Sequence, residues 1–324
     1  MRPKTVFVGG GTPTALAPED LARFFEIIDA HVDRSRVVEF SVEANPEDLD
    51  SAKIACLAAA GVNRVNLGVQ SFQPDVLETL GRAHDADRVR DSVRRIRAAK
   101  IPRIGLDLIF GVPGQSRAGL DADIDALLAL APDHISTYGL TYEPGTALTR
   151  ARDRGDVVIQ DEDDELALYR RLRERLAAAG FEHYEVSNFA RPGARCRHNL
   201  TYWRDRSHLG VGPSAVSFMD GERRKNLPGL AAWCAALERG EDPVGETERL
   251  TPAHALRERV MVALRLRHGI RLDQLRRASP DLDGLDLETV GRLREQHLLT
   301  DDPNRLELTE RGLELSDYVT AELL

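Results

Sequence analysis

The amino-acid sequence predicts an α/β fold, with a parallel sheet in its first part and a smaller, mostly helical domain at its C-terminal end. Short runs rich in β-branched residues alternate with longer helical runs up to about residue 142. Such alternation is typical of parallel strands joined by right-handed helical crossovers. After Tyr142-Glu143-Pro144-Gly145 the alternation ends and helical patterns predominate. The alternation alone leaves two architectures open, a doubly wound open sheet and a barrel.

Five strands are expected in this first part, over residues 5–8, 37–42, 64–69, 104–109 and 134–140. A helix is expected from Pro18, because Glu19 and Asp20 favour the positive end of a helix. Further helices are expected over residues 50–60, 75–80, 87–100 and 117–130. Gly61 follows the first of these directly and is a natural C-cap.

The remaining elements form a second region of different character. A helix over 161–179, a strand over 182–186 and an irregular segment over 190–199 are expected first. From about residue 227 the chain is expected to be helical, ending in helices over 272–277 and 285–296, a hairpin over 298–308 and a helix over 309–323. This final order resembles a winged helix. We therefore expect two domains, residues 1–222 and 223–324.

The composition is that of an ordinary globular protein, with 42% hydrophobic and 30% charged residues in 324. No apolar run reaches the roughly 20 residues of a membrane helix, and no signal-peptide core follows Met1. We therefore expect a cytoplasmic location and no stable membrane insertion. The net charge of −9 disfavours a nucleic acid as partner, because a basic surface is needed to neutralise phosphates.

The three cysteines, Cys56, Cys196 and Cys234, form no C-x-x-C pair. A disulfide framework or a structural zinc site is therefore not expected. Cys56 and Cys234 lie in apolar helical runs and are predicted to belong to the core. Cys196 differs, because it lies in Arg195-Cys196-Arg197-His198, next to a motif considered below.

Glycine and polar residues gather at or just beyond the C-terminal ends of the five expected strands. In parallel α/β folds ligands bind at that edge of the sheet, so their recurrence on successive strands predicts one coherent site. The residues concerned are Gly9, Gly10, Gly11 and Thr12 after the first strand, then Glu43, Gln70, Asp107 and Thr141 on the following four.

These residue types suit a ligand that combines an amino acid with a nucleoside. Glycines allow the backbone to approach a ligand with no side chain between. The carboxylates of Glu43 and Asp107 suit an ammonium group or ribose hydroxyls, and Gln70 can both donate and accept hydrogen bonds. Arg82 suits a carboxylate or a phosphate. A tight strand-to-helix turn is the alternative interpretation of the glycines, which match neither G-x-G-x-x-G nor a P-loop.

Five motifs occur in a specific order: GGGTPT, SVEANP, GVNRVNLGVQSF, GRAH and DLIFGVPGQS. In this order they resemble the radical S-adenosylmethionine (SAM) proteins of the coproporphyrinogen dehydrogenase and HemW group, over nearly the whole chain. The resemblance implies an incomplete parallel β/α barrel with SAM lying across the C-terminal ends of its strands. It also implies SAM contacts at Gly10, Gly11, Thr12, Glu43, Gln70, Arg82 and Asp107, and more weakly at Thr141.

A sixth motif, His198-Asn199-Leu200-Thr201-Tyr202-Trp203, is similar to the HNxxYW signature of HemW proteins. The resemblance implies haem as a ligand, with His198 as the candidate axial ligand, since imidazole commonly binds haem iron. Tyr202 and Trp203 could pack on a porphyrin face. The alternative interpretation is that His198 is a hydrogen-bonded core residue beside aromatic rings.

Members of this family also hold a [4Fe–4S] cluster on a C-x-x-x-C-x-x-C loop that precedes GGGTP. Here GGGTP begins at Gly9, and the three cysteines cannot replace that loop. The polypeptide as written is therefore not expected to cleave SAM. Two explanations are open, a misassigned start codon and a real truncation. We favour the first, because a sheet lacking its first strand would expose an unpaired edge.

The leading functional hypothesis is a HemW-like haem chaperone that binds haem and passes it to an unidentified acceptor protein, with SAM and a [4Fe–4S] cluster as ligands in the full-length form. The first alternative is an oxygen-independent coproporphyrinogen III dehydrogenase, which decarboxylates two propionates through a 5′-deoxyadenosyl radical. HNxxYW favours the chaperone. A DNA-binding regulator that uses the winged-helix-like end is a third hypothesis, which the acidic balance disfavours.

Overall fold

The computed structural model describes residues 2–282 and 284–323. The chain divides into two compact units, Met1–His198 and Asn199–Leu324. This division lies before the boundary expected after residue 222. The reason is that α8 (Asn199–Trp203) packs against α10 (Pro252–Leu264), and β8 (Val216–Met219) pairs with β9 (Glu222–Asn226). No helix among the described residues has both the length and the apolar character needed to cross a membrane.

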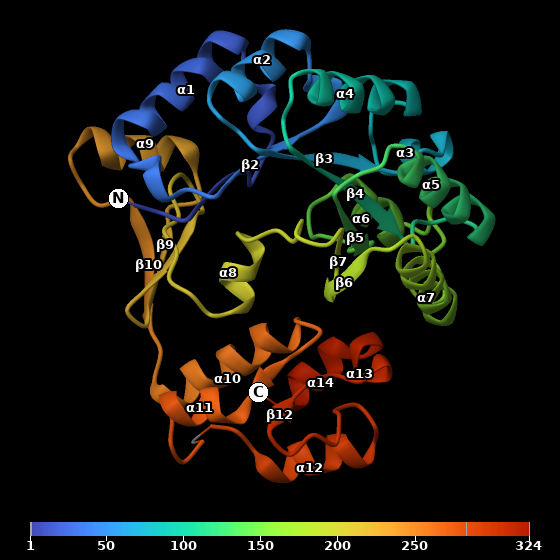
Figure 1. Cartoon of the computed structure of the whole chain (residues 1–324), viewed down its shortest axis with the longest axis vertical. Coiled ribbons are helices and arrows are strands. Elements are labelled where there is room, and N and C mark those ends of the chain that lie inside the picture. Colours follow the sequence, from blue (N-terminus) through green and yellow to red (C-terminus); the bar gives the residue numbers. More distant parts are fainter. Residues whose placement is uncertain (1, 283, 324) are drawn as a thin grey trace. The chain divides into compact units, whose positions relative to one another are not determined.

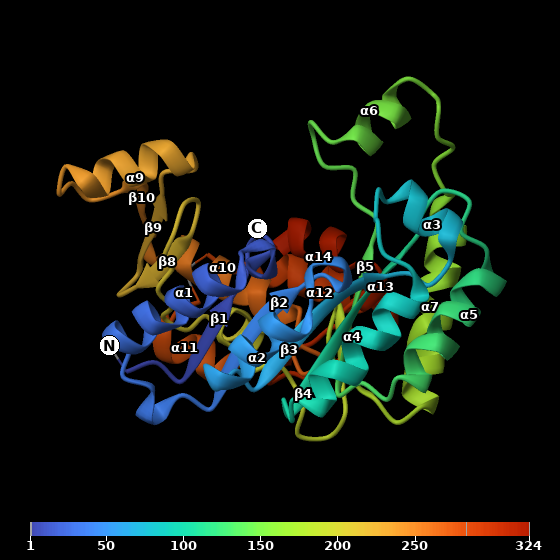
Figure 2. The same ribbon diagram turned by 90° about the horizontal axis from the view of Figure 1, so that it is seen from above.

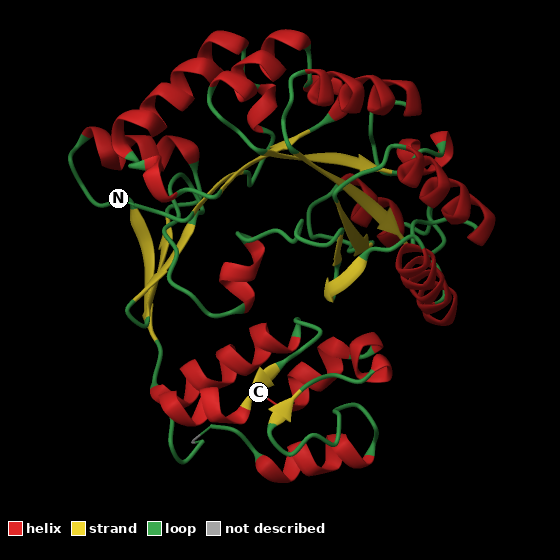
Figure 3. Cartoon of the chain, viewed as in Figure 1, coloured by secondary structure: helices red, strands yellow, loops and turns green. Residues whose placement is uncertain are grey.

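The first unit is built on a sheet that, within the described residues, has seven strands in the order β1-β2-β3-β4-β5-β7-β6. The five strands predicted from sequence are confirmed, and they pair in parallel in chain order. Their bounds are β1 (Thr5–Val8), β2 (Glu39–Ala44), β3 (Arg64–Gln70), β4 (Arg103–Phe110) and β5 (His134–Gly139). Two antiparallel strands, β7 (Asn188–Ala190) and β6 (Glu182–Glu185), complete the far edge. The sheet curves into a partial β/α barrel with helices on its convex face (Figures 1 and 3).

The helices of this unit begin where the sequence supplies N-cap side chains. Asp50, Asp85 and Ser116 each accept a hydrogen bond from the backbone N–H three residues on, so one unpaired donor of each helix is satisfied. The helices are α1 (Pro18–His31), α2 (Ser51–Ala59), α3 (Pro74–Thr79), α4 (Ala86–Ala98), α5 (Arg117–Ala129), α6 (Ala147–Asp153) and α7 (Glu162–Ala178). α6 has no counterpart among the helices predicted from sequence, and Figure 2 shows it at the far end of the loop that follows β5.

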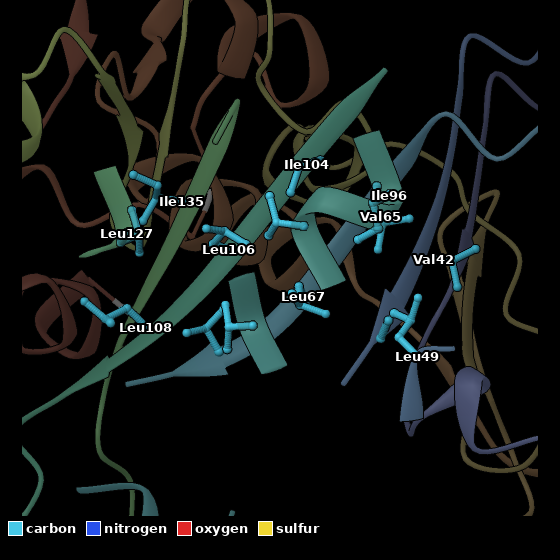
Figure 4. Close-up of a cluster of buried hydrophobic side chains, with 14 of the residues drawn as sticks. Val42, Leu49, Val65, Leu67, Ile96, Ile104, Leu106, Leu108, Leu127 and Ile135 are labelled. Carbon is cyan, nitrogen blue, oxygen red and sulfur yellow. The ribbon is translucent and has the colours of Figure 1, made fainter. Parts of the chain in front are cut away.

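The core lies between the convex face of the sheet and its helices. Alternate residues of each strand point to opposite faces, and on β3 and β4 the set Val65, Leu67, Ile104 and Leu106 is buried toward the helices (Figure 4). Burial of each such side chain stabilises the fold by about 1.5–3 kcal/mol. The residues between these apolar positions therefore face the concave side of the sheet, and most of them are polar.

The second unit contains a three-stranded antiparallel sheet, β10-β9-β8, within the described residues. The helical pattern expected from about residue 227 holds for α9 (Leu230–Glu238) and α10, but it is wrong for β10 (Val244–Arg249). The strands β8 and β9 were not predicted either. β9 and β10 carry charged, largely exposed side chains joined by cross-strand ion pairs such as Arg223–Glu248 (2.9 Å), so they lack the apolar alternation that reveals a strand.

The end of the chain folds as the winged-helix-like order predicts. It comprises β11 (Ile270–Arg271), α11 (Leu272–Ala278), α12 (Leu287–Glu295), β12 (Arg305–Leu306), α13 (Glu310–Glu314) and α14 (Ser316–Leu323). β12 pairs with β11, and an isolated bridge joins Leu299 to Leu308 in the expected hairpin. Leu264, Leu293 and Val319 are buried at the centre of these helices.

Candidate functional site

The concave face of the sheet carries a polar layer near the C-terminal ends of the strands. The strand register places Glu43 beside Asn66, Gly68 beside Asp107, and Asp107 beside Ser136. Among the described residues, Asn66 Oδ1 is buried and has no hydrogen-bond partner. Because buried polar atoms are nearly always paired in proteins, this face fits a polar ligand or ordered water.

The loop after β1 packs closely on Glu43. The Gly10 N–H donates to Glu43 Oε2 at 3.1 Å. A Cβ atom on Gly9 would lie 2.5 Å from Glu43 Oε2 and 2.7 Å from Phe7 Cε1, so these side chains would have to shift. Gly10 has φ +84°, and a Cβ on Gly10 or Gly11 would meet nothing within 4 Å. The first glycine therefore serves packing, while the next two leave backbone open toward the concave side.

Two carboxylates face this polar layer, and both resist ionisation. Burial raises the pKa of Glu43, an effect that the Gly10 N–H partly opposes. Burial raises the pKa of Asp107 to about 7, while a hydrogen bond with Ser136 lowers it and the charge of Glu43 raises it further. Two acids held together away from bulk water would be stabilised as anions by a cationic ligand.

Gln70 ends β3 in a left-handed conformation, with φ 65°, which is uncommon for a residue other than glycine. A Cβ on Gly68 would lie 2.9 Å from Gln70 Nε2 and 3.0 Å from Asn45 Oδ1, so the Gln70 and Asn45 side chains converge there. Asn45 Nδ2 in turn donates to Thr12 Oγ1 at 3.0 Å. Thr12 and Gln70, both predicted from sequence, thus both lie close to Asn45, which stands in the predicted motif SVEANP but was not among the predicted contacts.

The turn after Gln70 is fixed by Asp123 of α5, which is fully buried. Its carboxylate accepts from Ser71 Oγ at 2.7 Å, from Phe72 N at 2.8 Å and from Gln73 Nε2 at 3.1 Å. Burial raises the pKa of Asp123, and these three hydrogen bonds act in the opposite direction. The position of the Gln70 end of β3 therefore depends on a helix packed behind the sheet.

Two predicted contacts are less closely tied to this group. The backbone N–H of Arg82 donates to Leu77 O at 2.9 Å, and among the described residues no hydrogen bond or ion pair holds its guanidinium. Thr141 is exposed in the loop beyond β5. Their role in binding stays a prediction. The histidine of the GRAH motif, His84, is structural, because its Nε2 lies 2.9 Å from Val69 O and its Nδ1 2.9 Å from Glu47 Oε2.

His198 lies outside the strands of the sheet, in contact with β1. Its Nδ1 is 2.9 Å from Thr5 Oγ1, and its ring stacks on Phe7 with centroids 4.9 Å apart and planes inclined by 20°. The side chain is half-buried. The ring is thus held in one orientation by a polar and an aromatic contact, as either interpretation of the motif would allow.

The aromatic residues of the same motif lie in α8 of the second unit. The guanidinium carbon of Arg265 lies over the Trp203 ring, 4.5 Å from its centroid. Tyr202 is 37% exposed and meets the ring of His208 edge-on at 4.7 Å. One face of Trp203 is therefore covered and its side chain is half-buried, so Tyr202 is the more exposed of the two.

The described residues do not fit an iron–sulfur cluster. They contain no group of three or more His, Cys, Asp or Glu side chains that could hold a metal ion. Cys196 is buried with Sγ 3.5 Å from Glu39 Oε1, and Cys56 Sγ lies 3.5 Å from Pro18 O. Within the described residues, none of the three cysteines forms a disulfide.

The second unit contains a cavity of about 590 Å³ that the sequence analysis did not anticipate. Leu209, Val211, Met219 and Trp233 give it an apolar lining, and Arg224 lies among them. None of the predicted site residues lines it.

Sequence reasoning missed several polar residues of the concave face because it considered mainly strand ends. Glu39, Ser41, Asn66 and Ser136 alternate with buried apolar residues along β2, β3 and β5. Their positions at every second residue could have predicted that they share the concave face of the sheet.

Two family models match the chain. Residues 1–127 match the Radical SAM superfamily, and residues 250–315 match the HemN C-terminal domain. Among solved structures, coproporphyrinogen III oxidase (HemN) from Escherichia coli, described as a radical SAM enzyme, matches with a TM-score of 0.86 over 99% of this chain and 77% of that chain, at 20% identity. That likeness confirms the fold.

Curated relatives match nearly the whole chain. The heme chaperone HemW of Lactococcus lactis is 34% identical over 99% of this chain and 84% of its own length. HemW of Bacillus subtilis is 33% identical over 99% of this chain and 85% of its length. HemW of Mycobacterium tuberculosis is 38% identical over 99% of this chain and 80% of its length.

Proposed function

Because the chain belongs to the HemW haem-chaperone family of radical SAM proteins, we propose that it binds haem and transfers it to an acceptor protein. The observation that carries the proposal is the setting of His198. Its imidazole is held by the Thr5 hydroxyl and the Phe7 ring, within a motif similar to the family's signature. The likeness to coproporphyrinogen III oxidase is one of fold, so it carries no argument for that enzyme's activity.

Histidines that bind metals usually have their second ring nitrogen hydrogen-bonded, which fixes the ring and tunes its basicity. The contact of His198 Nδ1 with Thr5 Oγ1, at 2.9 Å, orients the imidazole ring that would ligate haem iron. The bound iron would supply the coordination site, and the protein would supply the orientation of the imidazole.

We further propose that SAM binds at the C-terminal ends of the strands. The open backbone at Gly10 and Gly11 and the carboxylates of Glu43 and Asp107 support this site, because SAM carries an ammonium group, a sulfonium and ribose hydroxyls. Thr12, Gln70, Arg82 and Thr141 are the further proposed contacts. Since the described residues do not fit a [4Fe–4S] cluster, no SAM cleavage is assigned to this chain.

A haem titration followed by absorbance tests the proposal. We expect saturation near one haem per chain and a sharp, shifted Soret band. His198→Ala should shift or abolish that band, since imidazole would be a ligand of the iron. His31→Ala is the matched control, because His31 is exposed at the end of α1 and its Nδ1 bonds only its own helix, to Ile27 O at 2.9 Å. An unchanged Soret band in His198→Ala would remove His198 from the ligand set.

Transfer is tested by mixing the haem-loaded chain with an apo-globin. The Soret band of the chain should decay while that of the globin appears, at a rate that rises with globin concentration. A rate independent of the acceptor would mean simple dissociation and would contradict a chaperone role.

A further inference from the structure

The segment that precedes α8 owes its position to one buried carboxylate. Glu39 of β2 is 4% exposed. Its Oε1 accepts from the backbone N–H of His198 at 2.9 Å, and its Oε2 accepts from that of Arg197 at 3.0 Å. The segment Ala194–His198 belongs to no strand or helix. These amides therefore depend on a side chain for the acceptors that a sheet or helix would otherwise supply.

A second buried side chain holds the same segment from the adjacent strand. Arg64 of β3 is 2% exposed, and its Nε lies 3.3 Å from Glu39 Oε2. Its Nη2 donates to the carbonyl of Ala194 at 2.7 Å and to that of Arg195 at 3.3 Å. The pair thus binds carbonyls at the start of the segment and amides at its end.

Such a buried ion pair is costly to desolvate, and an apolar pair of similar volume would often be at least as stabilising. Here, however, the charges satisfy four backbone groups of one short segment, two carbonyls and two amides. Tyr184 adds a further contact, since its hydroxyl accepts from Cys196 N at 3.3 Å. The arrangement therefore specifies where the main chain of His198 runs.

We propose that Glu39 is a positioning residue for His198, acting through the backbone to orient the imidazole. This inference rests on the proposed haem function. The main-chain N–H of His198 is held by Glu39, while its ring is held by Thr5 and Phe7. Loss of the main-chain contact removes one of the restraints on the segment that carries the ring, so the iron-binding geometry changes although the imidazole itself does not.

The first test uses the full chain without haem. Glu39→Gln keeps the volume but replaces one acceptor oxygen by an NH₂ group, so at least one of the two amides loses its partner. We expect faster backbone hydrogen exchange at Arg197 and His198. Asp133→Asn is the matched control, since Asp133 also pairs with an arginine, Arg103 (2.9 Å), and accepts a backbone N–H, that of Ile104 (3.0 Å).

Unchanged exchange at both amides in Glu39→Gln would overturn the proposal. If Glu39→Gln does not fold, as judged by circular dichroism, Glu39→Asp takes its place. Asp keeps the charge beside Arg64 but withdraws both acceptors by one methylene, so the two amides should again exchange faster than in the parent chain.

The second test measures haem binding. Supporting groups of metal ligands typically contribute roughly 10- to 100-fold in affinity, so Glu39→Gln should weaken haem binding by about that factor and alter the Soret band. In a His198→Ala background, Glu39→Gln should cause no further change, because Glu39 acts through His198. Additive losses in the double variant would overturn the positioning role.

The outcomes separate the inference from the function on which it rests. If His198→Ala weakens haem binding but Glu39→Gln does not, only the positioning role is wrong. If His198→Ala itself leaves the Soret band unchanged, the haem-ligand assignment fails first, and the positioning role falls with it.

Discussion

At the scale of single residues, the concave face is distinguished by acids that are not readily ionised. Glu43 and Asp107 face the same polar layer, and burial raises the pKa of each. Such an arrangement is unfavourable at neutral pH, because both carboxylates are partly buried and neither forms an ion pair within the described part of the chain. It favours a ligand that brings positive charge.

Asp107 should make the affinity for SAM depend on pH. Its pKa of about 7 lies above the usual 3.8, so the folded protein holds a proton there that a water-exposed carboxyl would lose. A cationic ligand binds the ionised form better, so SAM affinity should fall by up to about tenfold per pH unit below 7. Calorimetry between about pH 5.5 and 7.5 checks this. Asp107→Asn should bind more weakly and without this pH dependence, and the same slope in the variant would contradict the assignment.

The glycines after β1 are predicted to differ in their tolerance of a side chain. Gly9→Ala brings a methyl group 2.5 Å from Glu43 Oε2, so Glu43 must move. We expect a loss of about 1–3 kcal/mol in the free energy of unfolding, as in other overpacked sites. Gly11→Ala is the control, because the space around its Cβ is open, and it should stay within about 0.5 kcal/mol of the parent. Urea denaturation measures both, and equal stability of the two variants would argue against the packing role.

At the scale of elements, the strands with periodic apolar residues were predicted from sequence, and the strands with mostly charged residues were missed. The five parallel strands were found because Val65, Leu67, Ile104 and Leu106 mark buried faces. β9 and β10 escaped because their residues are charged and held by ion pairs across the strands. The site residues show the same limit. Glu43 and Asp107 stand where strands end, whereas Glu39 stands at the start of β2, and its role depends on a segment 159 residues away.

The link between β3 and α5 carries an element-scale prediction. Asp123→Asn leaves the side-chain volume intact but weakens three hydrogen bonds to the turn Ser71–Gln73. We expect a loss of about 1–3 kcal/mol in stability, since a buried polar group loses its partners, together with weaker SAM binding through displacement of Gln70.

Asp125→Asn provides the control for that variant. Asp125 lies on the same helix, but its carboxylate is largely exposed and pairs only with Arg175 at the surface. Exposed ion pairs contribute about 0–1 kcal/mol, so thermal unfolding should barely change. A comparable shift in both variants would mean that the turn is not held by Asp123.

At the scale of the whole molecule, the alternation of strands and helices predicted the partial barrel, and the order of the final helices predicted the C-terminal fold. The division between units was harder to predict. The structure places it after His198, because α8 contacts α10 and β8 pairs with β9, and such contacts are not visible in local sequence patterns. The family, by contrast, could be predicted from motif order alone, since five motifs in sequence are far more specific than any one of them.

The whole-molecule charge leads to the last prediction, which concerns the winged-helix-like end. Such a fold could bind DNA, but the chain has a net charge of −9, and several arginines of this region pair with acids. Arg271 and Arg277 both pair with Asp273, and Arg292 pairs with Glu322. Guanidinium groups already neutralised release few counterions on meeting phosphates, so there is little drive for duplex binding. Fluorescence anisotropy with a labelled duplex should therefore show no saturable binding even at low salt. Tight binding that weakens steeply with added salt would instead reveal a basic surface that these pairings leave available, and would restore DNA as a partner.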